Sequence, residues 1–314
     1  MYTDAAGYSF PRKKVFPLLS SIELNISDSC CEIEIPEFLE SFARAPALRC
    51  VDIRADCDND LIVFAVFLWA QLTDLTLTLS ITTHVARDLL VQCAALESVT
   101  LHGLRSSDDS ALLPEHITLH HLQTLDIMLA SGGGEPVLLD AVSLSQLQSL
   151  ALCQDFPDVS PTDGTAATLL TLHGRAPFTL EYLSLVRIDV EPDELFALLC
   201  ILPELKALEI IGTPRVGNRL LAMLTHGRPP SMRGLRLLHL RTLMIGPIHM
   251  VESLATHAGG VEAPFPTLHR LCLYRAAHYL AFVPLERSPE VLGRCLASAC
   301  STGFLVDRFL RRNS

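Results

Sequence analysis

The stretch GTPRVGNR, residues 212–219, is the part of the chain that comes nearest to a nucleotide-binding motif. It follows the strand-like run LEIIG and precedes a helix-like run, which is the setting of a phosphate-binding loop. In that motif a lysine after the second glycine contacts the phosphates, and the next hydroxyl holds magnesium. Here Asn218 and Arg219 follow Gly217 instead. We therefore interpret the stretch as a turn and predict no nucleotide cofactor.

Three histidines, His116, His120 and His121, form the best candidate metal cluster. Two histidines four residues apart on a helix can bind zinc. This stretch, however, leads into a predicted strand after Leu122, and no cysteine or carboxylate pair stands beside it at ligand spacing. We interpret it as a turn with solvated histidines. The sequence predicts neither a metal site nor a cofactor.

The sequence gives equally weak evidence for a catalytic site. The sequence contains no G-x-S-x-G elbow and no Cys–His signature. Its carboxylate pairs, Glu32/Glu34 and Asp108/Asp109, lie in segments that look like protein surface. The 10 cysteines form no C-x-x-C, and most stand among apolar residues, which is typical of reduced thiols that pack as small hydrophobes. We predict a non-enzymatic protein with no catalytic residues.

Composition and charge narrow the partners and the compartment. The net charge of −11 argues against nucleic-acid binding, which needs clustered Lys and Arg. The N-terminal residues contain no apolar signal segment, and the most apolar run, LIVFAVFLWA at 61–70, is too short to span a bilayer as a helix. We interpret that run as a buried helix. We expect a cytoplasmic or nuclear protein that is not secreted and binds neither nucleic acid nor membrane.

The elements that must position any functional side chain come from one hexamer, L-x-x-L-x-L, with Ile or Val allowed for Leu. The run QLTDLTLTLS, 71–80, contains one copy. The copies start at Leu19, Leu48, Leu72, Leu96, Leu122, Leu147, Leu180, Leu205, Leu235 and Leu268. The intervals range from 24 residues, between Leu72 and Leu96, to 33, between Leu147 and Leu180. Such a period is typical of leucine-rich repeats.

Between the hexamers the apolar spacing becomes helical. This is clearest in VARDLLVQCAAL (85–96), EPDELFALLCIL (191–202) and GNRLLAMLTHG (217–227). The sequence thus predicts an α/β leucine-rich-repeat solenoid of about ten irregular repeats, with parallel strands on a concave face and helices on a convex face. The solenoid covers 1–285 and a C-terminal capping helix or tail covers 286–314. ASGGGEP, 130–136, is predicted to be a loop within the solenoid.

One feature of regular leucine-rich repeats is missing. The expanded pattern places Asn or Cys eight residues after the first leucine, where it bonds to the turn backbone. Among other residues, this chain has Ser80, Leu104, Ala130 and Ile188 at that position. We therefore expect an irregular array in which each turn satisfies its backbone separately.

Three phrases carry a family resemblance: W-x-Q-L-T-x-L-T-L at Trp69–Leu77, L-L-x-x-C-x-x-L-E-x-x-T-L at Leu89–Leu101, and L-P-x-L-x-x-L-x-I at Leu202–Ile210. Together they resemble the leucine-rich-repeat portion of fungal F-box proteins, over roughly residues 15 to 285. The resemblance implies the substrate-receptor part of a ubiquitin ligase, in which an F-box holds a Skp-type adaptor and the repeats hold the substrate. Two alternatives stay open, a degenerate relative without a partner and an enzyme built on the repeats.

Partner-binding residues follow from the hexamer geometry. The third and fifth residues, and the one after the sixth, should point away from the core. In the C-terminal half these positions gather aromatic, basic and exposed apolar residues, which are frequent in binding hot spots. The predicted partner-binding set is Tyr182, Glu209, Ile211, Leu237, His239, Arg241, Arg270 and Tyr274. Its basic members would prefer a protein partner with an acidic segment. The alternative is that these side chains merely cover the sheet surface.

The hexamer at Leu19 leaves no room for an F-box ahead of it in this sequence, so the ligase role is carried over to no residue. A Skp-type adaptor is expected as a partner only if an F-box is present outside this chain. We predict that the chain alone does not retain a Skp-type adaptor in a pull-down assay. Retention at ordinary affinity would contradict this expectation.

Overall fold

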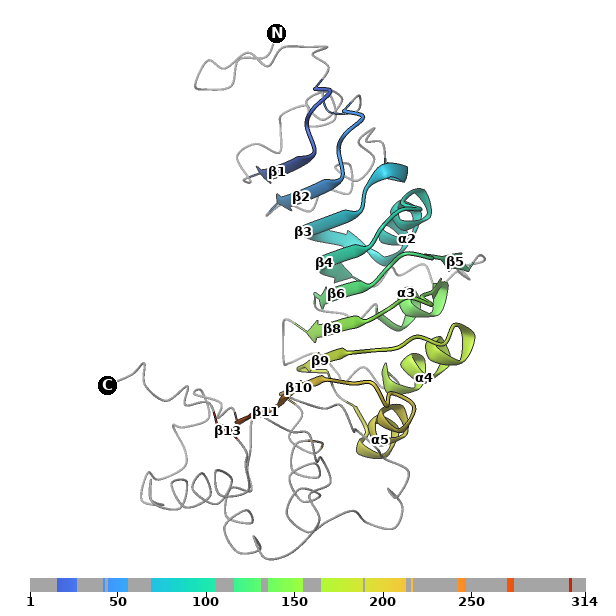
Figure 1. Cartoon of the computed structure of the whole chain (residues 1–314), viewed down its shortest axis with the longest axis vertical. Coiled ribbons are helices and arrows are strands. Elements are labelled where there is room, and N and C mark those ends of the chain that lie inside the picture. Colours follow the sequence, from blue (N-terminus) through green and yellow to red (C-terminus); the bar gives the residue numbers. More distant parts are fainter. Residues whose placement is uncertain are drawn as a thin grey trace, which may run out of the picture. The chain divides into compact units, whose positions relative to one another are not determined.

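Parallel strands joined by helices and turns make up the computed structural model of the chain (Figure 1). The structure describes residues 16–26, 42, 45–55, 69–105, 116–130, 135–154, 165–188, 190–212, 216, 242–246, 270–273 and 305–306. The chain divides into two compact units. Unit 1 comprises Met1–Leu147, Gln154–Val159 and Thr171–Phe178, and unit 2 comprises Gln148–Cys153, Ser160–Leu170 and Thr179–Ser314.

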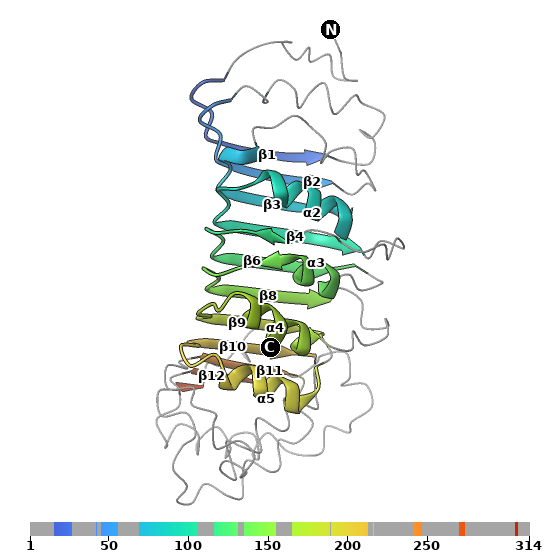
Figure 2. The ribbon, with the colours of Figure 1, turned by 90° about the vertical axis from the view of Figure 1, so that its right-hand side faces the viewer.

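The sheet of unit 1 runs in chain order, and every neighbouring pair of its strands is parallel. Its strands are β1 (Ser21–Ile26), β2 (Cys50–Ala55), β3 (Asp74–Thr82), β4 (Ser98–Arg105) and β6 (Thr124–Leu129). A short 3-10 helix, η3 (Trp69–Gln71), precedes β3, and β5 (Ile117–Thr118) pairs with β7 (Val142–Ser143). The helices α2 (Thr83–Gln92) and α3 (Glu135–Ala141) lie on one side of the main strands (Figure 2).

Unit 2 repeats the arrangement with parallel strands in chain order. They are β8 (Ser149–Gln154), β9 (Tyr182–Val186), β10 (Ala207–Ile211), β11 (Thr242–Gly246), β12 (Arg270–Leu273) and β13 (Leu305–Val306). The helix α5 (Pro192–Cys200) connects β9 to β10, and α4 (Thr165–Arg175) falls in the ranges of both units. The described residues thus form an α/β fold built on parallel strands.

Alternation within the hexamers explains the core. In β3, Leu75 and Leu77 are each 1% exposed, whereas Thr76 between them is only half-buried. The first leucine of this hexamer, Leu72, is fully buried and reaches the core from the turn before the strand, where its N–H donates to the Trp69 carbonyl at 3.1 Å. Successive side chains of a strand point to opposite faces. The inward leucines within β3 therefore stand two residues apart, and the step of three leads from Leu72 in the turn to Leu75 in the strand.

The same backbone bond links successive hexamers at their second residue. In unit 1, Thr73 N–H donates to the Arg49 carbonyl at 2.9 Å, and Glu97 N–H donates to the Thr73 carbonyl at 2.8 Å. In unit 2, Lys206 N–H donates to the Glu181 carbonyl at 2.8 Å. These bonds extend the strand pairing into the preceding turn, so backbone groups there find partners.

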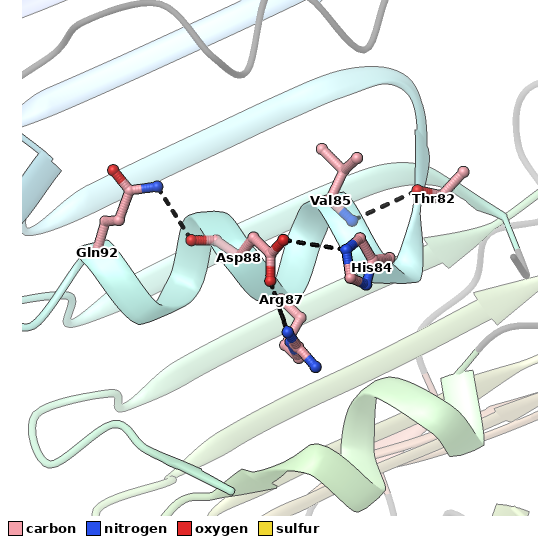
Figure 3. A network of polar contacts seen from close by, with 6 residues as sticks. All are labelled: Thr82, His84, Val85, Arg87, Asp88 and Gln92. Atoms are coloured by element: carbon pink, nitrogen blue, oxygen red, sulfur yellow. Dashed lines mark hydrogen bonds and ion pairs between the residues drawn. The ribbon is translucent and has the colours of Figure 1, made fainter. Parts of the chain in front are cut away.

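The helices α2 and α5 form where the 3.6-residue spacing predicts them. In α2, the Thr82 hydroxyl accepts the Val85 N–H at 3.4 Å as an N-cap (Figure 3). Leu89 and Leu90 of this helix are buried. In α5, Pro192 occupies the first turn, where its missing N–H costs no hydrogen bond. The side chains that α5 buries are Leu195, Phe196, Leu198 and Leu199.

The structure corrects the predicted ninth strand. We placed it on the hexamer at Leu235, but β11 begins at Thr242 and belongs to a second match, LRTLMI, which starts at Leu240. Leu243 and Ile245 pair in register with Leu208 and Ile210 of β10. Overlapping leucines from 235 to 243 satisfied the pattern twice, so spacing alone selected the wrong copy.

Three further differences concern helices. The loop predicted at 130–136 ends earlier, because α3 begins at Glu135. A helix was expected between successive hexamers, but the spacing did not locate α3 or α4. Arg175, at the end of α4, donates to the main-chain carbonyls of Leu139 and Asp140 in the last turn of α3, where carbonyls lack partners within the helix.

Several predictions fall outside the described residues. They concern the helix at 217–227, residues 61–68 of the predicted buried helix and, apart from β13, the capping segment 286–314. Trp69 and Ala70, the last residues of that buried helix, belong to η3. None of the helices that the structure describes is long and apolar enough to cross a membrane.

At the position where regular repeats carry asparagine, this chain has other residues, and the neighbouring backbone groups are bonded differently from one repeat to the next. Leu104 and Ile188 occupy it as fully buried apolar side chains. Beside them, Ala130 N–H donates to the Leu104 carbonyl at 2.9 Å, and Arg187 N–H donates to the Ile211 carbonyl at 2.5 Å. Leu104 lies in β4 and Ile188 follows β9, and at both positions main-chain bonds to the neighbouring segment form without an asparagine side chain.

Gly103 marks an irregularity between β3 and β4. The register shifts between the Thr78 and Ile81 pairs, and Gly103 adopts φ +92° there. A Cβ on this residue would lie 2.7 Å from the Leu79 carbonyl oxygen. Glycine is therefore required both by the backbone conformation and by the close approach of β3.

We expect Leu75→Asp to lower the free energy of unfolding by about 3 kcal/mol or more, because an unpaired carboxylate would enter the core. The matched control is Thr76→Asp, one residue along β3 on the opposite face, which should change stability by less than about 1 kcal/mol. Chemical denaturation of both variants measures the difference. Equal losses would contradict the assignment of the two faces.

Gly103→Ala should lower the free energy of unfolding by about 1–3 kcal/mol, because alanine disfavours the positive φ and clashes with β3. The control is Gly174→Ala in α4, where a Cβ meets nothing within 4 Å. That change should be neutral or stabilise by about 0.5 kcal/mol. Thermal unfolding of the two variants should therefore shift in opposite directions or, at least, by clearly different amounts.

Candidate interaction face

The side of each sheet that faces away from the described helices is the candidate site, and we name it the outward face (Figure 2). In unit 1 its residues are the first, third and fifth of each strand. They are Ser21, Glu23, Asn25, Cys50, Asp52, Arg54, Asp74, Thr76, Thr78, Ser98, Thr100, His102, Thr124, Asp126 and Met128. All are exposed or half-buried. The face is thus accessible and mainly hydroxylic or charged.

Arg54 organises the charges near the start of this face. Its Nη2 lies 2.8 Å from Asp52 Oδ2 and 3.7 Å from Glu23 Oε1, and its Nε donates to Asp52 Oδ1 at 3.3 Å. The hydrogen bonds to Asp52, followed by the charges of Asp52 and Glu23, raise the pKa of Arg54. Because Arg54 and Glu23 are exposed, these pairs orient side chains more than they stabilise the fold.

Two more contacts occupy the outward face of unit 1. His102 Nε2 lies 3.8 Å from Asp126 Oδ2 on the neighbouring strand. The Cys50 thiol donates to Asp74 Oδ2 at 3.5 Å. Burial, and then the nearby Asp74 carboxylate, raise the pKa of Cys50, so its reactive thiolate is disfavoured. Cys50 is therefore a poor candidate nucleophile.

In unit 2, Glu209 of β10 links a polar cluster on the outward face. Its Oε2 accepts hydrogen bonds from the Tyr182 hydroxyl at 2.7 Å and from the Ser184 hydroxyl at 2.8 Å, both on β9. Ser184 is only 4% exposed, although it belongs to a face predicted to be solvated. A buried hydroxyl needs a partner, and Glu209 supplies it.

The structure describes only part of the predicted partner-binding set. Tyr182, Glu209 and Ile211 lie on the outward face of unit 2, as their hexamer positions predict, and each is half-buried. Arg270 stands in β12 in register with Thr242. The remaining members, Leu237, His239, Arg241 and Tyr274, lie outside the described residues.

In the corrected register, Thr242, Met244 and Gly246 pair with Ala207, Glu209 and Ile211. Sequence reasoning missed them because the earlier leucine match was preferred. The available signal was the alternation in LRTLMI, which places Leu243 and Ile245 in phase with β10.

The three histidines of the candidate metal cluster and the buried thiol of Cys93 lie in the part of the chain that the structure describes. His116, His120 and His121 are exposed, and the stretch forms β5 and a turn and no helix. Among the residues that the structure describes, no group of three or more His, Cys, Asp or Glu could hold a metal ion. Cys93 is fully buried, and desolvation raises its pKa to about 12. This thiol packs as a small hydrophobe.

On the helical side, α2 carries a polar network of a different kind (Figure 3). Asp88 lies 3.2 Å from His84 Nε2 and 2.8 Å from Arg87 Nη2, and Gln92 donates to the Asp88 carbonyl at 3.1 Å. His84 and Asp88 are one helical turn apart, and a side-chain pair at this spacing stabilises a helix by about 0.2–0.5 kcal/mol. Nothing in this network converges on a reacting group.

Gly212 directly follows β10 and has φ +82°. A Cβ on this residue would lie 2.7 Å from Arg187 Cγ. Arg187 itself has φ +57°. The first glycine of GTPRVGNR therefore serves a tight backbone contact after the strand, while 213–215 and 217–219 lie outside the described residues.

Comparison with known proteins gives no family assignment: no family model matches the chain, and no curated protein matches it. The functional argument therefore rests on the outward faces of the two units.

Glu209→Ala should lower the free energy of unfolding by about 1–3 kcal/mol, because the buried Ser184 hydroxyl and the Tyr182 hydroxyl both lose this acceptor. The control is Glu97→Ala, which removes an exposed carboxylate from unit 1 and should change stability by less than about 0.5 kcal/mol. Denaturant titration of both variants provides the test. If Glu209→Ala costs no more than the control, Glu209 does not stabilise the cluster.

Proposed function

We propose that the chain is a leucine-rich-repeat solenoid that acts as a non-enzymatic protein–protein interaction scaffold. The support for the repeat is that nine described strands begin at the third residue of a predicted hexamer and that the strands pair in parallel in chain order within each unit. Stacked repeats of this kind bury apolar side chains that a single repeat leaves exposed.

The observation that carries the proposed function is the accessibility of the outward face in unit 1. Its side chains are mainly hydroxylic or charged groups presented by five adjacent strands, and the described helices α2 and α3 lie on the other side of these strands (Figure 1). A broad, regular surface of this kind fits a protein segment better than a small substrate, because small-molecule sites are concave and mostly apolar.

The resemblance to fungal F-box proteins adds a more specific proposal. The outward face would hold the substrate protein of a ubiquitin ligase, while a Skp-type adaptor would bind only through an F-box outside this chain. The cytoplasm and the nucleus are the compartments in which such a ligase component would act. The raised pKa values of Cys50 and Cys93 favour a binding role over thiol catalysis.

Site-specific photo-crosslinking tests this function. A photoreactive residue replaces Thr100 on the outward face in one variant and Val91, a 58% exposed residue of α2, in the other. We expect discrete protein adducts from position 100 in cell extract and few from position 91, identified by mass spectrometry. Adducts from position 91 alone, or equal yields from both positions, would place the interaction elsewhere.

A further inference from the structure

β1 lies at one end of the sheet of unit 1, and its inward side is less buried than that of the strands that follow it (Figure 2). Leu24 and Ile26 of β1 are half-buried, whereas Ile53 and Ala55, their partners in β2, are buried. Just before β1, the Leu18 side chain is 90% exposed. Exposed apolar side chains that gather at the end of a sheet indicate a surface for a further contact.

The backbone of β1 offers hydrogen-bonding groups at the edge away from β2. The Ser20 carbonyl accepts the Cys50 N–H at 3.1 Å, so the main-chain groups of Ser20 and of every second residue after it face β2. The main-chain groups of Ser21, Glu23 and Asn25 face the other edge, where no described strand pairs with them. An edge of this kind can pair with a strand of another chain.

The side chains of β1 suit a second copy of the same strand in antiparallel orientation. A register that places Glu23 opposite Glu23 of the second copy brings like charges together and is disfavoured. Shifted by two residues, the register places Glu23 opposite Asn25 of the second copy, and the Asn25 amide can donate to the carboxylate. Leu24 then stands opposite Leu24, and Ile22 stands opposite Ile26. A shift by one residue would turn the inward side chains to the outward face.

Arg54 adds charge complementarity to the shifted register. It stands in register with Asn25 of its own chain, so Glu23 of the second copy lies two strand spacings away, about 10 Å between Cα atoms. The side chains of Arg54 and Glu23 are 52% and 68% exposed, and they lie 3.7 Å apart within one chain. Their combined length covers the distance across the edge, so each Arg54 can pair with both Glu23 carboxylates. This pairing reduces the repulsion between two chains that each carry a net charge of −11.

We propose that β1 is the interface of a homodimer, in which two copies of the chain pair antiparallel along residues 22–26 with Leu24 opposite Leu24. The inward side chains of one copy then cover those of the other, and the main-chain groups of Glu23 and Asn25 find partners. The inference goes beyond the proposed function, because the second copy adjoins the edge of β1 and leaves the outward face of both copies accessible. Five paired residues per copy form a small interface, so the dimer is reversible and depends on concentration.

A single cysteine tests the register. The main-chain groups of Leu24 face β2, so Leu24 and its counterpart form a non-hydrogen-bonded pair with Cα atoms about 4.5 Å apart. That spacing permits a disulfide. Under mild oxidation, the full chain with Leu24→Cys should therefore give a covalent dimer of twice 34.4 kDa in non-reducing electrophoresis.

Two controls accompany this variant. Ile22→Cys places the new thiol opposite Ile26 and should give several-fold less dimer. The unchanged chain, with its 10 cysteines, gives the background. No dimer above this background from Leu24→Cys, or equal yields from the two variants, would overturn the proposal.

Charge variants test the same interface at equilibrium without changing an inward side chain. Asn25→Asp places a carboxylate opposite Glu23 and should weaken the dimer several-fold, whereas Asn25→Gln should retain it. The matched control is Thr78→Asp, at the fifth residue of β3 and away from the interface, which should leave dimerisation unchanged. Analytical ultracentrifugation at low ionic strength, over a range of protein concentrations, measures the dissociation constants. A monomer at every concentration, or equal weakening by Asn25→Asp and Thr78→Asp, would contradict the proposed interface.

Discussion

Burial of the hexamer leucines is the constraint on which the rest of the structure depends. One strand of this chain presents apolar side chains on one face only, and a lone strand cannot remove them from water. Leu75 and Leu77 become buried because β2 and β4 align Val51, Ile53, Val99 and Leu101 beside them in register. At about 25 cal/mol per Å² of apolar surface, this stacking is the main favourable contribution to folding.

The same constraint creates the outward face. Because strand side chains alternate, every inward leucine fixes an outward neighbour. The parallel register then aligns these neighbours across strands, which is how Glu209 reaches the hydroxyls of Tyr182 and Ser184. The hydrogen bonds of Glu209 also show that outward does not always mean solvated, since Ser184 is buried beneath its partners.

The described connections between strands depart from a strict repeat in their backbone angles and hydrogen bonds. Gly103 accepts a positive φ and a close approach to Leu79, and Arg187 and Gly212 adopt positive φ values beside each other. Arg175 satisfies carbonyls at the end of α3 from another helix. With buried Leu104 and Ile188 in place of asparagine, main-chain bonds and individual side chains stabilise the described turns.

The sequence by itself determined the strands, the faces of their residues and two of the helices, because these follow from local periods of 2.0 and 3.6 residues. It also excluded a complete phosphate-binding loop. Only the tertiary structure decided between the overlapping leucines at 235 and 240, since the choice depends on the register with β10. It alone revealed the Glu209 cluster, because this cluster joins residues that are distant in sequence and meet only through strand pairing.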